Sequence, residues 1–290
     1  MAEFLQFLFS GLTVGAVYAL VALGFTLIHN ASGVVNFAQG EFVMLGGMIT
    51  VFAAQAGLPL AVAAGVAIGV TALVGVALYR LAIAPAGSAS VVSIIIITMG
   101  ASLFLRGTAQ SVFDKQIHRF PAFSGETPIT IGGATLMPQS LWVLGGAAVV
   151  FVALHRFLAH TLPGKAVLAT ASNKLAAQLV GINTHAVLLL AFGLSAAIGA
   201  VAGVLITPLT MTTADMGVSV ALKGFAAAML GGMGIPVGAI VGGLGLGLIE
   251  AFTAGYLSSA YKEATAFLVI LVVLVLMPRG LFGPKDVERV

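Results

Sequence analysis

The sequence predicts an all-α integral membrane protein, a single transmembrane domain over residues 1–290 with about eight to nine membrane-spanning helices. Sixty per cent of the residues are hydrophobic, 7% are charged, and the mean hydropathy is +1.16. A soluble domain would carry roughly one quarter charged residues. Apolar stretches of about 20 residues, the length that a helix needs to cross hydrocarbon, recur along the chain. The absence of cysteine excludes disulfides, and the formal charge of +3 makes no basic face for nucleic acid.

Each apolar stretch predicts one helix. The N-terminal MAEFLQFLF has no basic region and runs straight into an apolar segment, so it is expected to be a retained span and not a cleaved signal. The predicted spans are 4–28, 37–56, 58–82, 91–105, 140–159, 184–206, 218–232, 237–256 and 264–277. The segment 218–232 is short and flanked by glycine, so it either crosses fully or is re-entrant. Residues 107–139 are expected to form a polar external loop, because Gly132, Gly133 and three prolines favour turns.

The stretch 155–183 is the one long amphipathic helix that the sequence predicts outside the spans. Its two faces follow helical spacing. Lys165, Asn173, Lys174 and Gln178 lie on the polar face, and Leu168, Ala171, Leu175 and Leu179 lie on the apolar face. Such a helix either docks on a partner protein or lies on the lipid surface, and the spacing leaves both interpretations open.

Lys and Arg concentrate on the cytoplasmic side of membrane proteins, which predicts the topology. The amphipathic stretch and the C-terminal tail are basic, so both are expected inside, with the N-terminus and the loop 107–139 outside. Basic residues expected inside are Arg80, Arg156, Lys165, Lys174, Arg279, Lys285 and Arg289, against Arg106, Lys115, Arg119 and Lys262 outside. Lys223 remains within the membrane.

Polar groups inside spans are costly unless they are paired or face water, so each is a candidate functional residue. The candidate residues of a substrate pathway are Asn36, Gln39, Glu41, Thr98 and Lys223. Two structural explanations compete with that role. Lys223 and either Glu41 or Glu250 could neutralise each other, or the two glutamates could reach the interface by extending their side chains.

No catalytic pattern is present in the sequence. His155 and His160 are five residues apart, which does not place them on one helical face. The glycine run MLGGMGIPVG lacks the Lys-Ser/Thr that ends a phosphate-binding P-loop. We therefore expect no enzymatic activity, no metal site, no cofactor and no ATP site in this chain.

Four ordered blocks of the sequence resemble a known family. They are VGAVYALVALGFTLIHNASGVVNFAQGEFVMLGG, GKAVLATASNKLAAQLVGIN, ALKGFAAAMLGGMGIPVGAIVGGLGLGLIEAF and LMPRGLFG. Together they resemble the LivH-type permease subunit of bacterial branched-chain amino acid ABC importers. The resemblance implies that the segment 160–183 is the cytoplasmic coupling helix that docks on an ATPase. The implied coupling residues are Gly164, Lys165, Leu168, Lys174, Leu175, Leu179, Gly181 and Asn183.

The resemblance also implies partners and a location. It implies a second homologous permease subunit, as a homo- or heterodimer, two cytoplasmic ATPase subunits that bind ATP-Mg, and a periplasmic binding protein that delivers the amino acid. The location would be the bacterial inner membrane. Gln39 stands where the family commonly has histidine, and Leu168 stands where it usually has arginine. The first change argues against a proton-linked role at position 39, because a neutral amide does not take up a proton near neutral pH as imidazole does. The second change favours apolar contacts in the dock.

The expected function is therefore that of a permease subunit for branched-chain or other neutral amino acids. An ABC permease for urea, a sugar or a nucleoside is the nearer alternative. A secondary transporter is the more distant one, because it would need a buried ionisable pair and inverted repeats. Lys223 with Glu250 could supply the pair, but the hydropathy shows no convincing repeat.

Overall fold

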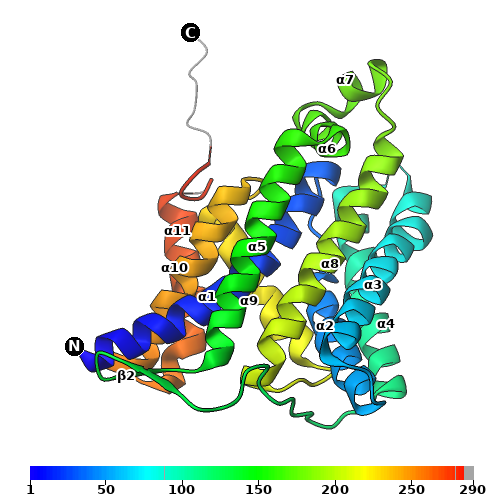
Figure 1. Ribbon diagram of the computed structural model, residues 1–290. Coiled ribbons are helices and arrows are strands. Elements are labelled where there is room, and N and C mark those ends of the chain that lie inside the picture. Colours follow the sequence, from blue (N-terminus) through cyan, green and yellow to red (C-terminus); the bar gives the residue numbers. More distant parts are fainter. Residues whose placement is uncertain (88, 278, 284–290) are drawn as a thin grey trace.

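The computed structural model describes residues 1–87, 89–277 and 279–283, which form a helical bundle (Figure 1). The long helices are α1 (Ala2–Ser32), α2 (Gln39–Gln55), α3 (Leu60–Leu78), α4 (Val91–Val112), α5 (Pro138–His160), α8 (Thr184–Thr210), α9 (Met216–Gly231), α10 (Pro236–Tyr256) and α11 (Lys262–Leu276). The short elements are α6 (Leu162–Ser172), α7 (Lys174–Leu179), a π-helical turn η1 (Tyr79–Ile83), the 3₁₀ turns η2 (Ala84–Ala86) and η3 (Ser259–Tyr261), and the strands β1 (Ile129–Ile131) and β2 (Ala134–Leu136).

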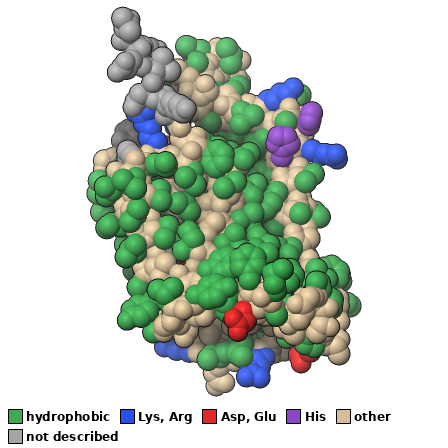
Figure 2. Space-filling view, turned by 90° about the vertical axis from the view of Figure 1, so that its left-hand side faces the viewer, with side chains coloured by type: hydrophobic (Ala, Val, Ile, Leu, Met, Phe, Trp, Pro, Cys, Tyr) green, Lys and Arg blue, Asp and Glu red, His purple; other side chains and the backbone are tan. Residues whose placement is uncertain are grey.

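Six described helices are long and apolar enough to cross a membrane: α1, α3 with its continuation to Ala86, α4, α5, α8 and α10. The helices α2, α9 and α11 have 17, 16 and 15 residues. The total of eight to nine spans therefore stays a prediction. Figure 2 shows one face of the bundle, on which hydrophobic side chains fill the middle while charged and histidine side chains gather at the two ends. This banding is expected of a surface that contacts lipid.

The bundle has two chemically different ends. The helices α6 and α7 lie at one end, which we call the α6 end, and the N-terminus and the hairpin β1–β2 lie at the other, which we call the hairpin end (Figure 1). The hairpin pairs Ile129 with Leu136, and its turn is Gly132-Gly133, both with positive φ. The predicted loop was therefore wrong in two details: α4 continues to Val112, and the loop contains a small antiparallel sheet.

Two helices of the bundle begin in its interior. The α2 helix starts beside the middle of α8, where the Gln39 side-chain amide donates to the Ser195 carbonyl oxygen at 3.2 Å. The α9 helix starts beside α2, because a Cβ atom on Gly217 would lie only 2.9 Å from the Gly40 carbonyl oxygen. Residues 33–38 and 211–215 lead inward to these starts. The α9 helix ends beside the C-terminal end of α1, where the Asn30 side-chain amide donates to the Gly234 carbonyl oxygen. The chain therefore passes from one end of the bundle to the other between residues 211 and 232.

The segments α1–α2–α3 and α8–α9–α10 repeat one arrangement in opposite directions. The α1 helix packs on α9 and α10, and α8 packs on α2 and α3. The turns into α3 and α10 read Gly-Leu-Pro-Leu and Gly-Ile-Pro-Val, and Gly57 and Gly234 both have φ of +93°. The hydropathy shows no convincing repeat, because every long span is strongly apolar. The repeat is visible instead in the interior helix starts and in the turns.

Glycines allow α1 and α10 to touch along their backbones. A Cβ atom on Gly11 or Gly15 would lie 2.9 Å from a Cα atom of α10, and Gly243 faces Ala19 in the same contact. Close backbone approach of this kind is the usual role of small residues four apart in membrane helices. By contrast, nothing lies within 4 Å of a Cβ atom at Gly65. The same spacing therefore marks a helix contact in one place and an open surface in another.

Candidate functional site

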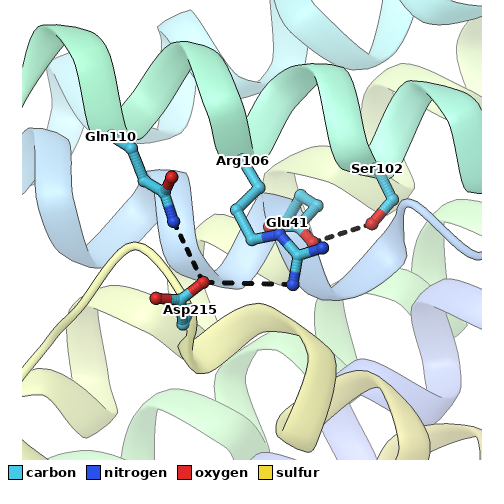
Figure 3. A network of polar contacts seen from close by, with 5 residues as sticks. All are labelled: Glu41, Ser102, Arg106, Gln110 and Asp215. Atoms are coloured by element: carbon cyan, nitrogen blue, oxygen red, sulfur yellow. Dashed lines mark hydrogen bonds and ion pairs between the residues drawn. The ribbon is translucent and has the colours of Figure 1, made fainter. Parts of the chain in front are cut away.

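Glu41 is the centre of a polar cluster at the start of α2 (Figure 3). Its side chain is only 1% exposed. One carboxylate oxygen, Oε1, accepts a hydrogen bond from the Ser102 hydroxyl of α4 at 2.8 Å. The other, Oε2, has no hydrogen-bond partner among the described residues. A buried carboxylate oxygen without a donor is costly, so this position is a candidate for contact with a ligand.

Arg106 of α4 lies between Glu41 and the carboxylate of Asp215 (Figure 3). Its Nη1 atom is 3.9 Å from Asp215 Oδ1, and the Gln110 side-chain amide donates to the same oxygen at 3.1 Å. The Arg106 and Asp215 side chains are 26% and 66% exposed. The cluster therefore runs from a buried carboxylate to an accessible one, with a guanidinium between them.

An apolar cluster adjoins these charges. Met44, Leu45 and Met48 of α2 pack with Ala109 of α4 and Ala214, which precedes Asp215. Methionine side chains are flexible and adapt to different apolar shapes. The site thus combines two carboxylates, one guanidinium and an adaptable apolar wall.

The loop after α4 holds the segment that leads into α9, and we call residues 114–118 of this loop the strap. His118, in the loop after α4, and Thr212 exchange two backbone hydrogen bonds of 2.9 and 3.0 Å. Asp114 anchors the strap by contacting the His118 ring at 2.9 Å and accepting from the Gln116 backbone N–H at 2.7 Å. These bonds lower the pKa of Asp114, so their stabilising contribution is present at neutral pH and is lost as the pH falls through that lowered pKa.

The structure does not gather all the predicted pathway residues at this cluster. Gln39 is fully buried and exchanges hydrogen bonds with Ser195, which joins α2 to α8. Asn36 is also buried, and its Oδ1 atom accepts from the Ala38 backbone N–H at 3.1 Å. Thr98 donates to the Ile95 carbonyl oxygen of its own helix. In this structure these three side chains hold backbone in place, and only Glu41 belongs to the charged cluster.

Lys223 belongs to a second polar cluster. Its ammonium lies 3.1 Å from Glu250 Oε1 and 5.6 Å from the centre of the Tyr18 ring. The Tyr18 hydroxyl donates to Glu250 Oε2 at 2.8 Å. The structure therefore confirms that Lys223 and Glu250 form an ion pair and neutralise each other. Glu41 takes no part in that pair.

Comparison with known proteins identifies the family. The model of a family described as the permease component of branched-chain amino acid transport systems matches residues 7–277. The chain belongs to this family. The high-affinity branched-chain amino acid transport system permease protein LivH of Escherichia coli (strain K12) is 34% identical, over 99% of this chain and 98% of its own length. The corresponding protein BraD of Pseudomonas aeruginosa is 33% identical over the same shares.

Two further comparisons of this permease component are more distant, one with a protein sequence and one with a solved structure. The ribose import permease protein RbsC of Escherichia coli (strain K12) is 26% identical, over 91% of this chain and 83% of its own length. A solved structure, PsaBC from Streptococcus pneumoniae in complex with Fab, superposes with a TM-score of 0.52 at 15% identity. The superposition covers 97% of this chain and 94% of the PsaBC chain. At that identity the likeness concerns the fold alone.

The predicted coupling segment of this permease component is two helices, not one. The Thr161 hydroxyl caps α6 by accepting from the Gly164 N–H at 3.0 Å. The chain breaks at Asn173, which has extended backbone (φ −158°) and caps α7 through the Ala176 N–H at 2.9 Å. Asparagine favours such caps over helix interiors, which is why the single predicted helix was wrong.

The coupling residues fall into two groups. Gly164 is buried against the backbone of α5, Gly181 follows α7 with φ of +86°, and the Asn183 side chain caps α8. These three shape the segment. The remaining predicted residues are exposed and available for contact: Lys165, Leu168, Lys174, Leu175 and Leu179. Leu175 and Leu179 are 73% and 88% exposed, beside Val180 at 77%.

Four members of the Glu41 cluster were not among the predicted site residues: Ser102, Arg106, Gln110 and Asp215. A signal for three of them was available. Ser102, Arg106 and Gln110 are each four residues apart, which places them on one side of α4. Nothing in the local sequence shows that Asp215 meets this face, because that contact depends on the interior start of α9.

Proposed function

We propose that this chain is the membrane-spanning permease subunit of an ATP-driven importer for branched-chain or other neutral amino acids. The observation that carries the proposal is membership of the permease-component family over residues 7–277. The proposed partners are a second homologous permease subunit, two cytoplasmic ATPase subunits that bind ATP-Mg, and a periplasmic binding protein. ATP hydrolysis would occur on the ATPase subunits, and this chain would form the membrane pathway.

The distribution of charge supports an orientation. Five described basic residues lie at the α6 end: Arg80, Arg156, Lys165, Lys174 and Arg279. No described Asp or Glu lies there. The hairpin end carries residues of both signs. Because positive residues collect on the cytoplasmic side, the α6 end would face the cytoplasm of an inner membrane and the N-terminus would lie outside. Lys285 and Arg289, which supported the same prediction, lie outside the described residues.

A cysteine at Ser172 tests this orientation, since the chain has no cysteine of its own. We expect the Ser172→Cys thiol, exposed at the end of α6, to react with a membrane-impermeant maleimide only after the membrane is opened. Thr127→Cys, exposed in the loop before β1, is the matched control and should react in intact cells whose outer membrane has been permeabilised. Reaction of Ser172→Cys in those intact cells would contradict the proposed orientation.

The Glu41 cluster would line part of the substrate pathway. A neutral amino acid carries an ammonium, for which Glu41 and Asp215 are the complementary charges, and a carboxylate, for which Arg106 is the complementary charge. The methionines beside them suit a branched aliphatic side chain. The outer surface of α4 is apolar, with Ile96, Leu103 and Phe104 between 61% and 72% exposed. A second permease subunit packed on α4 would enclose the cluster from that side.

Uptake by the reconstituted assembly tests the function itself. Proteoliposomes containing this chain with its permease partner, ATPases and binding protein should accumulate leucine, isoleucine or valine when ATP is supplied inside. Ribose serves as the second substrate, because the relative RbsC is a ribose import permease. ATP-dependent uptake of ribose without amino acid uptake would replace the proposed substrate with a sugar. Uptake that is independent of ATP would contradict the importer.

A further inference from the structure

Three cavities adjoin one another at the hairpin end. Their volumes are about 290, 260 and 270 Å³. All three are bordered by Val14 of α1, and Lys262 borders two of them. Their walls come from the hairpin-end parts of α1, α5, α8, α9 and α10, together with β2 and the start of α11. We call this set of cavities the vestibule.

The Lys223–Glu250 pair lies at the inner limit of the vestibule. Lys223 and Tyr18 border one cavity and Glu250 borders a neighbouring one, so the pair is approached from two sides. Glu250 is 1% exposed and the Lys223 side chain 12%. The described contacts of the Lys223 ammonium are one carboxylate oxygen and one aromatic face. An ammonium has three donors, so it keeps hydrogen-bonding capacity toward the cavity.

We propose that the base of the vestibule binds a zwitterionic amino acid, with its carboxylate on Lys223 and its ammonium on Glu250, which keeps its hydrogen bond from the Tyr18 hydroxyl. The apolar wall formed by Val14, Val17 and Val220 would receive the aliphatic side chain. This site is separate from the Glu41 cluster. The inference rests on the proposed function, because it takes the carried substrate to be an amino acid.

An exchange of partners makes this binding physically reasonable. Separating a buried ion pair leaves two uncompensated charges and is strongly unfavourable. A zwitterion brings one charge of each sign, so inserting it between Lys223 and Glu250 leaves both charges paired. An amino acid derivative that lacks either charge would leave one of them unpaired. The chemistry of the site therefore selects for molecules that carry both groups.

Occupancy of the site would also affect α9. The ion pair joins α9 to α10, and the start of α9 carries Asp215 and Gly217 next to Glu41. Inserting a ligand between Lys223 and Glu250 would loosen the contact between α9 and α10. The vestibule and the Glu41 cluster would then be linked through one helix, which both sites contact.

Protection of a cysteine from chemical labelling tests the site without requiring transport. Ser10→Cys and Ser219→Cys each place the sole thiol of this chain in a vestibule wall. Ser111→Cys, exposed on α4, is the matched control outside the cavities. The complete assembly without its binding protein is placed in nanodiscs and reacted with a hydrophilic methanethiosulfonate. The labelling rate of this chain is then measured with and without leucine.

We expect leucine at ten times its dissociation constant to slow labelling in the vestibule about tenfold, with no effect at Ser111→Cys. Leucinamide, which lacks the carboxylate, and 4-methylpentanoate, which lacks the ammonium, should protect little. The double variant Lys223→Met, Glu250→Gln removes both charges together, which avoids an unpaired buried charge. It should remain labelled at the same rate and lose protection by leucine.

Two results would overturn the site. One is labelling that leucine, up to its solubility limit, does not slow. The other is protection that is equal for leucine and both analogues, because binding would then not depend on the two charges. Leucine uptake by the wild-type assembly is measured in parallel. Normal uptake without protection refutes this site alone, whereas absent amino acid uptake refutes the proposed function.

Discussion

Replacing both Leu175 and Leu179 with aspartate is expected to abolish ATP-driven uptake and the binding of the ATPase subunits. Both side chains lie outside the bundle, 73% and 88% exposed on α7. Burying two leucines against a partner contributes about 3 kcal/mol or more, so their loss should weaken docking over a hundredfold. Because α7 contributes little to the bundle core, the variant should still insert and fold. Recovery of the ATPases with a tagged permease, together with leucine uptake, measures both effects.

The matched control for this prediction is Leu257→Asp. Leu257 is 74% exposed, but it follows α10 at the opposite end of the bundle. The same substitution there should leave ATPase recovery unchanged. Normal uptake by the Leu175→Asp, Leu179→Asp variant would remove the docking proposal. It would favour the alternative in which the amphipathic segment lies on the lipid surface.

Glu41→Gln is expected to lower uptake at least about tenfold while the assembly stays intact. The amide oxygen can still accept from Ser102, so the local packing should survive. The variant loses the negative charge beside Arg106 and the buried oxygen that has no described hydrogen-bond partner. A charge-assisted hydrogen bond is worth roughly 1.5–3 kcal/mol, which corresponds to at least a tenfold effect. Initial uptake rates and the amount of purified assembly are the two measurements.

Two further substitutions separate a pathway role from a structural one. Ser102→Ala removes only one hydrogen bond from Glu41 and should lower uptake much less than Glu41→Gln. Asn36→Leu removes the buried contact that holds the Ala38 backbone before α2. It should lower the amount of folded protein, and the protein that does fold should transport normally. An unaltered rate and substrate range in Glu41→Gln would refute the lining role of that residue.

The boundaries of most helices could be predicted from composition and span length. Proline at the start of α5 and α10 and glycine at the turns mark helix ends because of fixed backbone preferences. The break between α6 and α7 was missed, although Asn173 is a common capping residue. Amphipathic spacing continues across that residue, so hydrophobic periodicity alone favoured one helix.

The candidate site was predicted only in part. Glu41 was found because a carboxylate within an apolar span is unusual. The same polarity predicts Gln39, Asn36 and Thr98, and each of these side chains bonds a backbone group in the structure. Asn36 is satisfied only in part, because its Nδ2 atom has no hydrogen-bond partner among the described residues. Polarity within a span identifies groups that need a partner, but it does not show whether the protein itself supplies that partner.

The sequence by itself determined that this chain is a helical membrane protein, where its long helices lie, and which charges mark each end. Those properties follow from local composition and spacing. Only the tertiary structure decided that α2 and α9 begin inside the bundle, that Asp215 meets the Arg106 face, and that Glu250 and not Glu41 pairs with Lys223. Such contacts join residues far apart in the chain, and all apolar spans look alike to hydropathy. Close packing at particular glycines selects which helices meet.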